Sequence, residues 1–121
     1  MLCIDPYLTC SIEEKTQILN LRERFHRLDP AMLQELDGVL VTHGHDDHLD
    51  VPSLKEIARV SESSFGIPAP LVLLVQDQLE AKSIHPTKDG DSFMLKGFKI
   101  TPIAAAHTNY ETDSLKNHVF F

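Results

Sequence analysis

The chain has 121 residues, 42% of them hydrophobic, and a formal net charge of −7, which suits one domain with a hydrophobic core. The acidic balance argues against a nucleic-acid partner, because contacts with phosphates need clustered lysine and arginine. With no run of eighteen apolar residues, no export signal and only two cysteines, we expect no membrane span, reduced thiols and a cytoplasmic location.

The first part of the chain predicts one strand and two helices. Residues 1–5 form the strand, which ends where Pro6 follows Asp5, because proline cannot donate a hydrogen bond to a ladder. A serine–glutamate capping box starts a helix over residues 11–28. An Asp-Pro step ends that helix and opens a short one over residues 30–36.

The middle of the chain predicts strands alternating with helices. Residues 39–42 are an apolar strand of the kind that is buried on both faces. A helix begins after Asp50, which is a suitable N-cap. We interpret residues 61–70 as a loop, residues 71–75 as the next buried strand and residues 76–82 as a helical turn.

The last part of the chain predicts antiparallel strands. Residues 92–95 and 98–103 flank a lysine–glycine pair, and two strands around a two-residue glycine turn predict a β-hairpin. Residues 104–107 continue out of the second strand, and residues 117–121 resemble another strand. The whole pattern is βαβαβ followed by antiparallel strands, which is a mixed α/β fold.

A cluster of imidazoles and carboxylates follows the central strand directly. It comprises His43, His45, Asp47 and His48, with the spacing His-x-His-x-Asp-His. Neutral imidazole and ionised carboxylate are the usual ligands of zinc, iron and manganese. Alternation along a strand would bring the first two histidines to the same side, and Gly44 between them lets the backbone bend and a metal approach. The cluster therefore predicts a divalent-metal site.

Residues 42–48, which carry this spacing, resemble the metal-binding signature of the metallo-β-lactamase-fold hydrolases. Residues 4–8 and 102–107 resemble two further motifs of one branch, the lactonases related to L-ascorbate-6-phosphate lactonase. The resemblance implies a four-layer αβ/βα sandwich, classed as α/β or, by some schemes, α+β. Residues 1–121 then look like a single incomplete domain, the N-terminal half of such a sandwich without its first strands.

The resemblance also implies which residues bind metal. His43, His45 and His107 would bind a first ion, while Asp47 and His48 would belong to a second, with Asp47 also moving protons. The ions would be zinc or manganese. The remaining ligands of the family, a bridging aspartate and a last histidine, have no matching motif here, which leaves the second ion with two protein ligands and its occupancy open.

Asp5 has two interpretations at this stage. By resemblance, a carboxylate at this strand end lies close to the metal loop and supports the ligands. The alternative is an ordinary turn-forming aspartate ahead of a proline.

The resemblance implies a hydrolase in which metal-bound hydroxide attacks a cyclic ester or a related carbonyl. The expected partners are a small-molecule substrate such as a sugar-acid lactone and, in a homo-oligomer, a second copy of the chain. Two alternatives remain open. One is a non-catalytic metal-binding fragment that needs its missing half, and the other is a phosphodiesterase or nuclease of the same superfamily. Because helices can cover one face of the sheet only, we further expect the second face to stay open or to pack on another chain.

Overall fold

The structure of the chain is a computed structural model that describes residues 1–9, 30–79, 83–106, 109 and 111–121. The helix expected over residues 11–28 lies outside the described residues. Four parallel strands form the main sheet in the order β1 (Leu2–Ile4), β2 (Gly38–Leu40), β3 (Ser64–Pro68), β4 (Ile84–Thr87). A second, antiparallel sheet pairs β5 (Phe93–Leu95) with β6 (Phe98–Ile100). The described helices are α2 (Pro30–Gln34), α3 (Val51–Val60) and α4 (Ala69–Val75).

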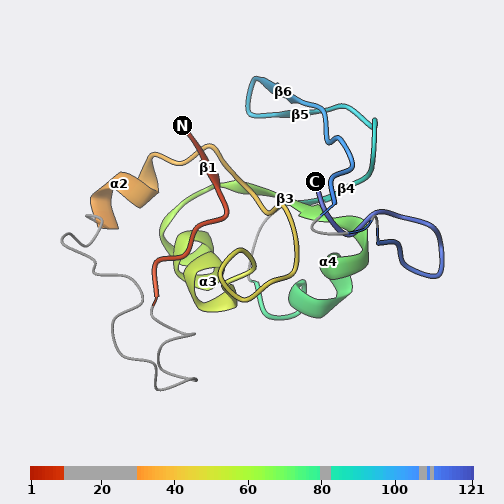
Figure 1. The fold of residues 1–121 in the computed structure, drawn as a ribbon. Helices are drawn as coiled ribbons and strands as arrows, with labels where there is room; N and C mark the ends of the chain where they lie inside the picture. Colours follow the sequence, from red (N-terminus) through yellow and green to blue (C-terminus); the bar gives the residue numbers. More distant parts are fainter. Residues whose placement is uncertain (10–29, 80–82, 107–108, 110) are drawn as a thin grey trace, which may run out of the picture.

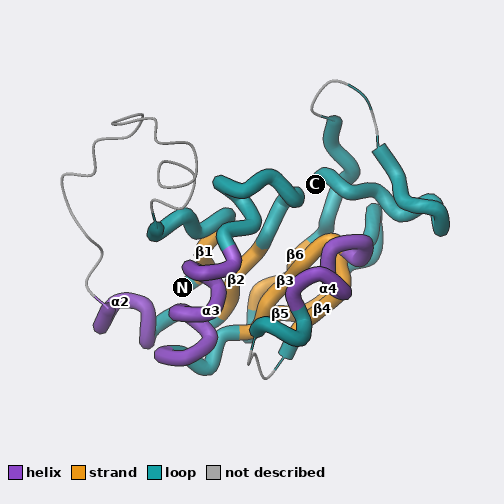
Figure 2. Tube along the Cα trace, turned by 90° about the horizontal axis from the view of Figure 1, so that it is seen from below, coloured by secondary structure: helices purple, strands orange, loops and turns teal. Residues whose placement is uncertain are grey.

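The order of the main sheet dictates where its helices lie. Neighbouring strands follow one another in the sequence, and each pair is parallel. Parallel crossovers are almost always right-handed, so crossovers that advance in one direction place all their helices on the same face. Figures 1 and 2 show α3 and α4 on one side of the sheet accordingly. None of the described helices is long and apolar enough to span a membrane.

The core lies between this face of the sheet and the helices. Val39, Phe65 and Ile67 from the two central strands are fully buried, as are Leu54 and Ile57 of α3. Each such side chain contributes roughly 1.5–3 kcal/mol by leaving water. The buried cluster as a whole contains Leu33, Leu36, Val39, Val41, Leu54, Ile57, Phe65, Ile67, Val75 and Leu79. This packing fixes the carboxyl ends of the central strands, from which the candidate site extends.

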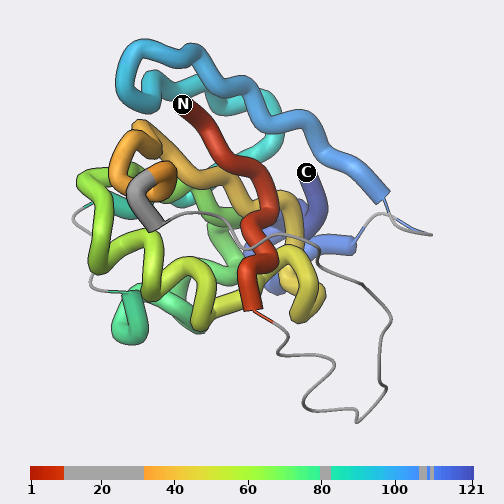
Figure 3. Tube along the Cα trace, turned by 90° about the vertical axis from the view of Figure 1, so that its left-hand side faces the viewer, coloured from red at the N-terminus to blue at the C-terminus, as the bar shows by residue number. Residues whose placement is uncertain are grey.

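The hairpin formed by β5 and β6 covers the other face, as Figures 1 and 3 show. It approaches the backbone of the sheet closely at two glycines. A Cβ atom at Gly38 would lie 1.9 Å from Cδ2 of Leu95, and one at Gly66 would lie 3.2 Å from Cζ of Phe93. The expectation that this face stays open is therefore wrong at its centre. At the edge strand β1, Ile4 is 61% exposed.

The hairpin turn follows the prediction from sequence. Lys96 and Gly97 both have positive φ, at 48° and 91°. Positive φ at both central residues is the type I′ geometry, whose twist matches that of the flanking strands. Residues 101–103, which were predicted to extend the second strand, lie beyond β6.

The prediction for residues 61–75 was wrong, because β3 occupies the expected loop and α4 occupies the expected strand. Within this stretch Gly66 is where the hairpin packs, and Pro68 is the last strand residue and the N-cap of α4. Pro70 lies in the first helical turn, which tolerates proline. A short apolar run such as residues 71–75 fits a helix as well as a strand, and periodicity does not separate the two.

Three smaller differences concern the flanks. Strand β4 was not predicted, because Pro86 argues against a strand, but β4 is an edge strand of the described sheet and edges tolerate proline. Residues 104–106 form no strand, and in place of a strand over residues 117–121 the structure has a single bridge between Thr112 and His118. The short helix α2 and the turn at residues 76–78 agree with the predictions.

Candidate metal centre

The histidine-rich loop leaves the carboxyl end of β2 and leads into α3, which begins at Val51. Strand β1 runs parallel beside β2, so its own carboxyl end brings Asp5 to the same edge of the sheet. The backbone N–H of Asp5 donates to the carbonyl of Leu40 over 2.8 Å, which holds the two strand ends together. Carboxyl ends of parallel strands are where ligands usually bind in such sheets.

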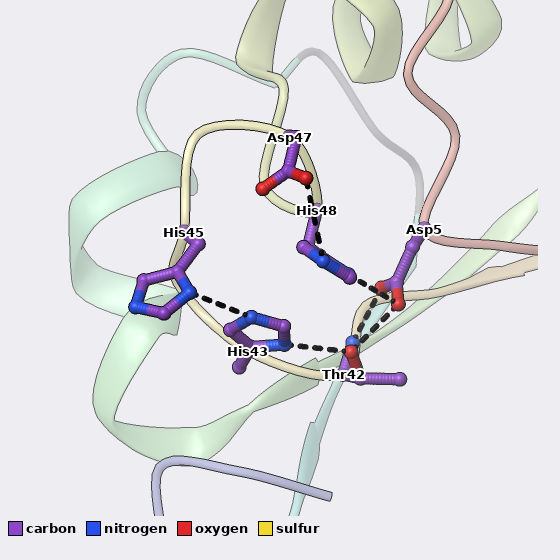
Figure 4. A network of polar contacts seen from close by, with 6 residues as sticks. All are labelled: Asp5, Thr42, His43, His45, Asp47 and His48. Atoms are coloured by element: carbon purple, nitrogen blue, oxygen red, sulfur yellow. Dashed lines mark hydrogen bonds and ion pairs between the residues drawn. The ribbon is translucent and has the colours of Figure 1, made fainter. Parts of the chain in front are cut away.

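Asp5 is the anchor of the polar network in Figure 4. Its carboxylate accepts the backbone N–H of Thr42 at 2.7 Å and the Thr42 hydroxyl at 2.6 Å. Its Oδ2 also lies 2.8 Å from Nδ1 of His48. Asp5 adopts a φ of 47°, a left-handed conformation that is uncommon for residues other than glycine. Of its two interpretations from sequence, these contacts favour a carboxylate that supports the metal loop.

The imidazoles converge next to this anchor. Nε2 of His43 lies 3.0 Å from Nδ1 of His45, and the Thr42 hydroxyl lies 2.9 Å from Nδ1 of His43. The ring centroids of His43 and His48 are 3.9 Å apart. Oδ2 of Asp47 lies 3.6 Å from Nε2 of His48. The loop thus brings together His43, His45, Asp47 and His48, whereas His107 lies outside the described residues.

His43 is buried, and its surroundings favour the neutral ring. Burial is the largest cause that lowers its pKa, and the nearby imidazoles of His48 and His45 lower it further. The carboxylates of Asp5 and Asp47 act in the opposite direction, but the net change is downward. A neutral imidazole is the form that binds metal, so His43 needs no deprotonation to act as a ligand near neutral pH.

The donors fit a divalent cation. Asp5, His43 and His48 each offer one ligand atom, and these atoms all lie within 4.8 Å of one another. Ligands about 2.0–2.2 Å from a tetrahedral zinc ion are separated by somewhat less than this, so modest side-chain shifts suffice. Imidazole nitrogen and carboxylate oxygen are also the correct donor types for zinc or manganese. Asp5 was not among the ligands expected from sequence, and its proximity to the histidines depends on the pairing of β1 with β2.

Two further features surround the loop and had no signal in the sequence. The ring of Phe120 stacks on His43 with centroids 5.0 Å apart and meets the edge of His45 at 5.8 Å. Asp50 occupies the N-cap of α3 as predicted, but its carboxylate makes no capping bond to the helix backbone. It accepts hydrogen bonds from the hydroxyls of Ser53 and Thr9 instead, which ties residues 1–9 to the start of the helix.

Comparison with known proteins adds an independent line of support. Residues 2–120 match the family described as the beta-lactamase superfamily domain. The chain is also 31% identical over 128 residues to a UPF0173 metal-dependent hydrolase of Polynucleobacter asymbioticus, in an alignment that covers 98% of this chain. The same alignment covers 41% of that relative, so the chain spans about two fifths of the length of the curated relative that it matches.

Proposed function

The chain belongs to the beta-lactamase superfamily, and on that premise we propose that it carries the metal centre of a metal-dependent hydrolase. The observation that carries this proposal is the convergence of three imidazoles beside the Asp5 carboxylate: Nε2 of His43 lies 3.0 Å from Nδ1 of His45, and the ring centroids of His43 and His48 are 3.9 Å apart. The name of the matched relative, a metal-dependent hydrolase, agrees with it. We further propose zinc or manganese as the ion and a lactone or related cyclic ester as the substrate.

Within this proposal His43 and His45 would hold the ion, and His107 would complete the set. His48 and Asp47 lie on the adjacent side of the loop and serve a second ion where one is bound. When bound, such an ion lowers the pKa of a water molecule to about 7 and polarises a carbonyl oxygen.

The protein groups have separate tasks around the reacting atoms. The Asp5 carboxylate only accepts hydrogen bonds, so its contact with His48 makes Nδ1 of that ring the donor, and Nε2, which lies 3.6 Å from Oδ2 of Asp47, is the nitrogen that could bind metal. The Asp47 side chain is 28% exposed, so its carboxylate is accessible to a proton from water or substrate. Asp47 therefore holds the proton that the reaction releases, at one of its carboxylate oxygens.

Metal content is the first test. The purified chain should hold about one equivalent of zinc or manganese, and a His43→Ala, His45→Ala double variant should hold far less. His85→Ala is a matched control, because His85 lies in β4 against the ring of Phe93 and away from the cluster. Equal metal in the wild type and in the double variant would contradict the proposal.

Substrate class is tested with a panel of sugar-acid lactones. Hydrolysis should disappear with a chelator, return when metal is restored and fall strongly in Asp47→Ala. Cleavage of a phosphodiester probe without lactone hydrolysis would instead indicate the phosphodiesterase type of superfamily member. The net charge of −7 argues against a nucleic-acid substrate, because a chain of phosphodiesters is a polyanion.

A further inference from the structure

Thr42 links the Asp5 carboxylate to His43. Its hydroxyl oxygen lies 2.6 Å from Oδ2 of Asp5 and 2.9 Å from Nδ1 of His43, so one atom touches both groups. Its backbone N–H is held by the other oxygen of the same carboxylate at 2.7 Å. Thr42 is thus fixed at two points, and Figure 4 shows it between Asp5 and His43.

Hydrogen counting decides the direction of both contacts. A threonine hydroxyl has one hydrogen to donate and two lone pairs to accept with, whereas an ionised carboxylate only accepts. The hydrogen of Thr42 must therefore point to Asp5, in the shorter and charge-assisted bond. Nδ1 of His43 must then carry a hydrogen and donate it to the hydroxyl oxygen.

This direction determines the tautomer of His43. A neutral imidazole has one N–H, and if Nδ1 holds it, Nε2 presents a bare lone pair. Nε2 is the nitrogen that faces His45, the neighbouring residue of the proposed ligand set, at 3.0 Å. The opposite tautomer would place the hydrogen on Nε2 and leave that nitrogen without a lone pair for a ligand bond.

We propose that Thr42 is a positioning residue that transmits the Asp5 contact to His43 and fixes this ring with its hydrogen on Nδ1 and its lone pair on Nε2. The inference rests on the proposed metal function but concerns a residue to which that function assigns no role. It requires a hydroxyl at position 42, since a methyl group of the same shape cannot accept from Nδ1.

The test compares Thr42→Val, which replaces the hydroxyl by a methyl group, with Thr42→Ser, which keeps the hydroxyl. Thr101→Val is the matched control, because Thr101 is exposed and its hydroxyl contacts Ser92 beside the hairpin. The tautomer of His43 in the metal-free chain is read from the ¹⁵N chemical shifts of its ring nitrogens. Affinity is measured by competition for Co²⁺ with a chromophoric chelator, and thermal melts monitor folding.

The wild type, Thr42→Ser and Thr101→Val should show His43 protonated on Nδ1, and Thr42→Val should lose this preference. Thr42→Val should also bind Co²⁺ about 10–100-fold more weakly, the usual effect of removing the group that orients a ligand. A wild-type ring protonated on Nε2, or the same tautomer in Thr42→Val, would overturn the inference. A wild type with the expected tautomer but no Co²⁺ binding would overturn the proposed function alone. If Thr42→Val does not fold, the wild-type tautomer still decides.

Discussion

At the scale of single residues, Asp5 combines an unusual backbone conformation with the contacts that hold the metal loop. Its φ of 47° is disfavoured for a residue with a Cβ atom, although aspartate and asparagine tolerate this conformation better than most other residues. Its carboxylate meets Thr42 and His48 in three contacts of 2.6–2.8 Å. Backbone strain and side-chain bonding therefore act in opposite directions at one position.

Three substitutions separate these two effects. Asparagine in Asp5→Asn tolerates the positive φ but carries no charge. Glycine in Asp5→Gly removes the strain of the positive φ and also removes the side chain. Asp5→Ala loses the side chain and keeps the strain, so we expect it to be the least stable, about 1 kcal/mol below Asp5→Gly. Urea unfolding of the metal-free proteins measures this. An alanine variant more stable than the glycine variant would show that the positive φ causes no strain.

The lowered pKa of His43 predicts how the stability of the metal-free protein depends on pH. Because burial and neighbouring imidazoles hold the folded pKa below the unfolded value of about 6.5, the unfolded state binds more protons in acid. The contribution of neutral His43 is present above about pH 6.5 and is lost as the pH falls towards the folded pKa. The free energy of unfolding should therefore decrease from pH 7 to pH 5 more steeply in the wild type than in His43→Gln. Parallel curves for the two proteins would contradict this.

At the scale of elements, the hairpin depends on its packing against the sheet. Leu95 is 1% exposed, and a Cβ atom at Gly38 would lie 1.9 Å from its Cδ2 atom. Leu95→Ala should cost roughly 2–5 kcal/mol through the cavity that it leaves. Gly38→Ala should cost roughly 1–3 kcal/mol, because the leucine must move out of the way.

The two changes should be coupled. In the Leu95→Ala background the cavity accommodates the new methyl group, so Gly38→Ala should cost less there than alone. Denaturant melts of the four proteins give the coupling energy. Met94→Ala is the control within β5, since its side chain is 59% exposed and its loss should change stability by about 0.5 kcal/mol or less. If the losses in the free energy of unfolding from Gly38→Ala and Leu95→Ala simply add in the double variant, the hairpin does not pack on Gly38 in solution.

Features encoded locally could be predicted from the sequence, and those that depend on distant contacts could not. The hairpin turn and the histidine loop each lie within a short stretch, so their patterns were visible. By contrast, residues 61–70 were interpreted as a loop, because the contacts that require Gly66 come from distant parts of the chain: a Cβ atom there would lie 2.7 Å from Cδ2 of Leu40 and 3.2 Å from Cζ of Phe93. The contact of Phe120 with His43 and His45 likewise spans most of the sequence, and nothing near Phe120 signals it.

At the scale of the whole molecule, one edge of the main sheet combines unpaired backbone with apolar side chains. Among the described strands β1 pairs only with β2, which makes it an edge strand of the described sheet. Ile4 in this strand is 61% exposed, and Met1 before it is 49% exposed. Edge strands in native proteins usually carry charges, bulges or a covering segment that prevents association with other chains. None of the three residues of β1, Leu2, Cys3 and Ile4, carries a charge.

We therefore predict that the 121-residue chain self-associates reversibly through β1. Sedimentation velocity over a hundredfold range of concentration should show a weight-average mass that rises with concentration. Ile4→Lys should shift this curve towards the monomer, because a charge on an edge strand opposes pairing with another chain. Leu115→Lys is the matched control, since Leu115 is 79% exposed but lies in a turn with no strand edge to offer. A monomeric wild type at all concentrations, or an equal effect of the two lysines, would show that the β1 edge is not the contact.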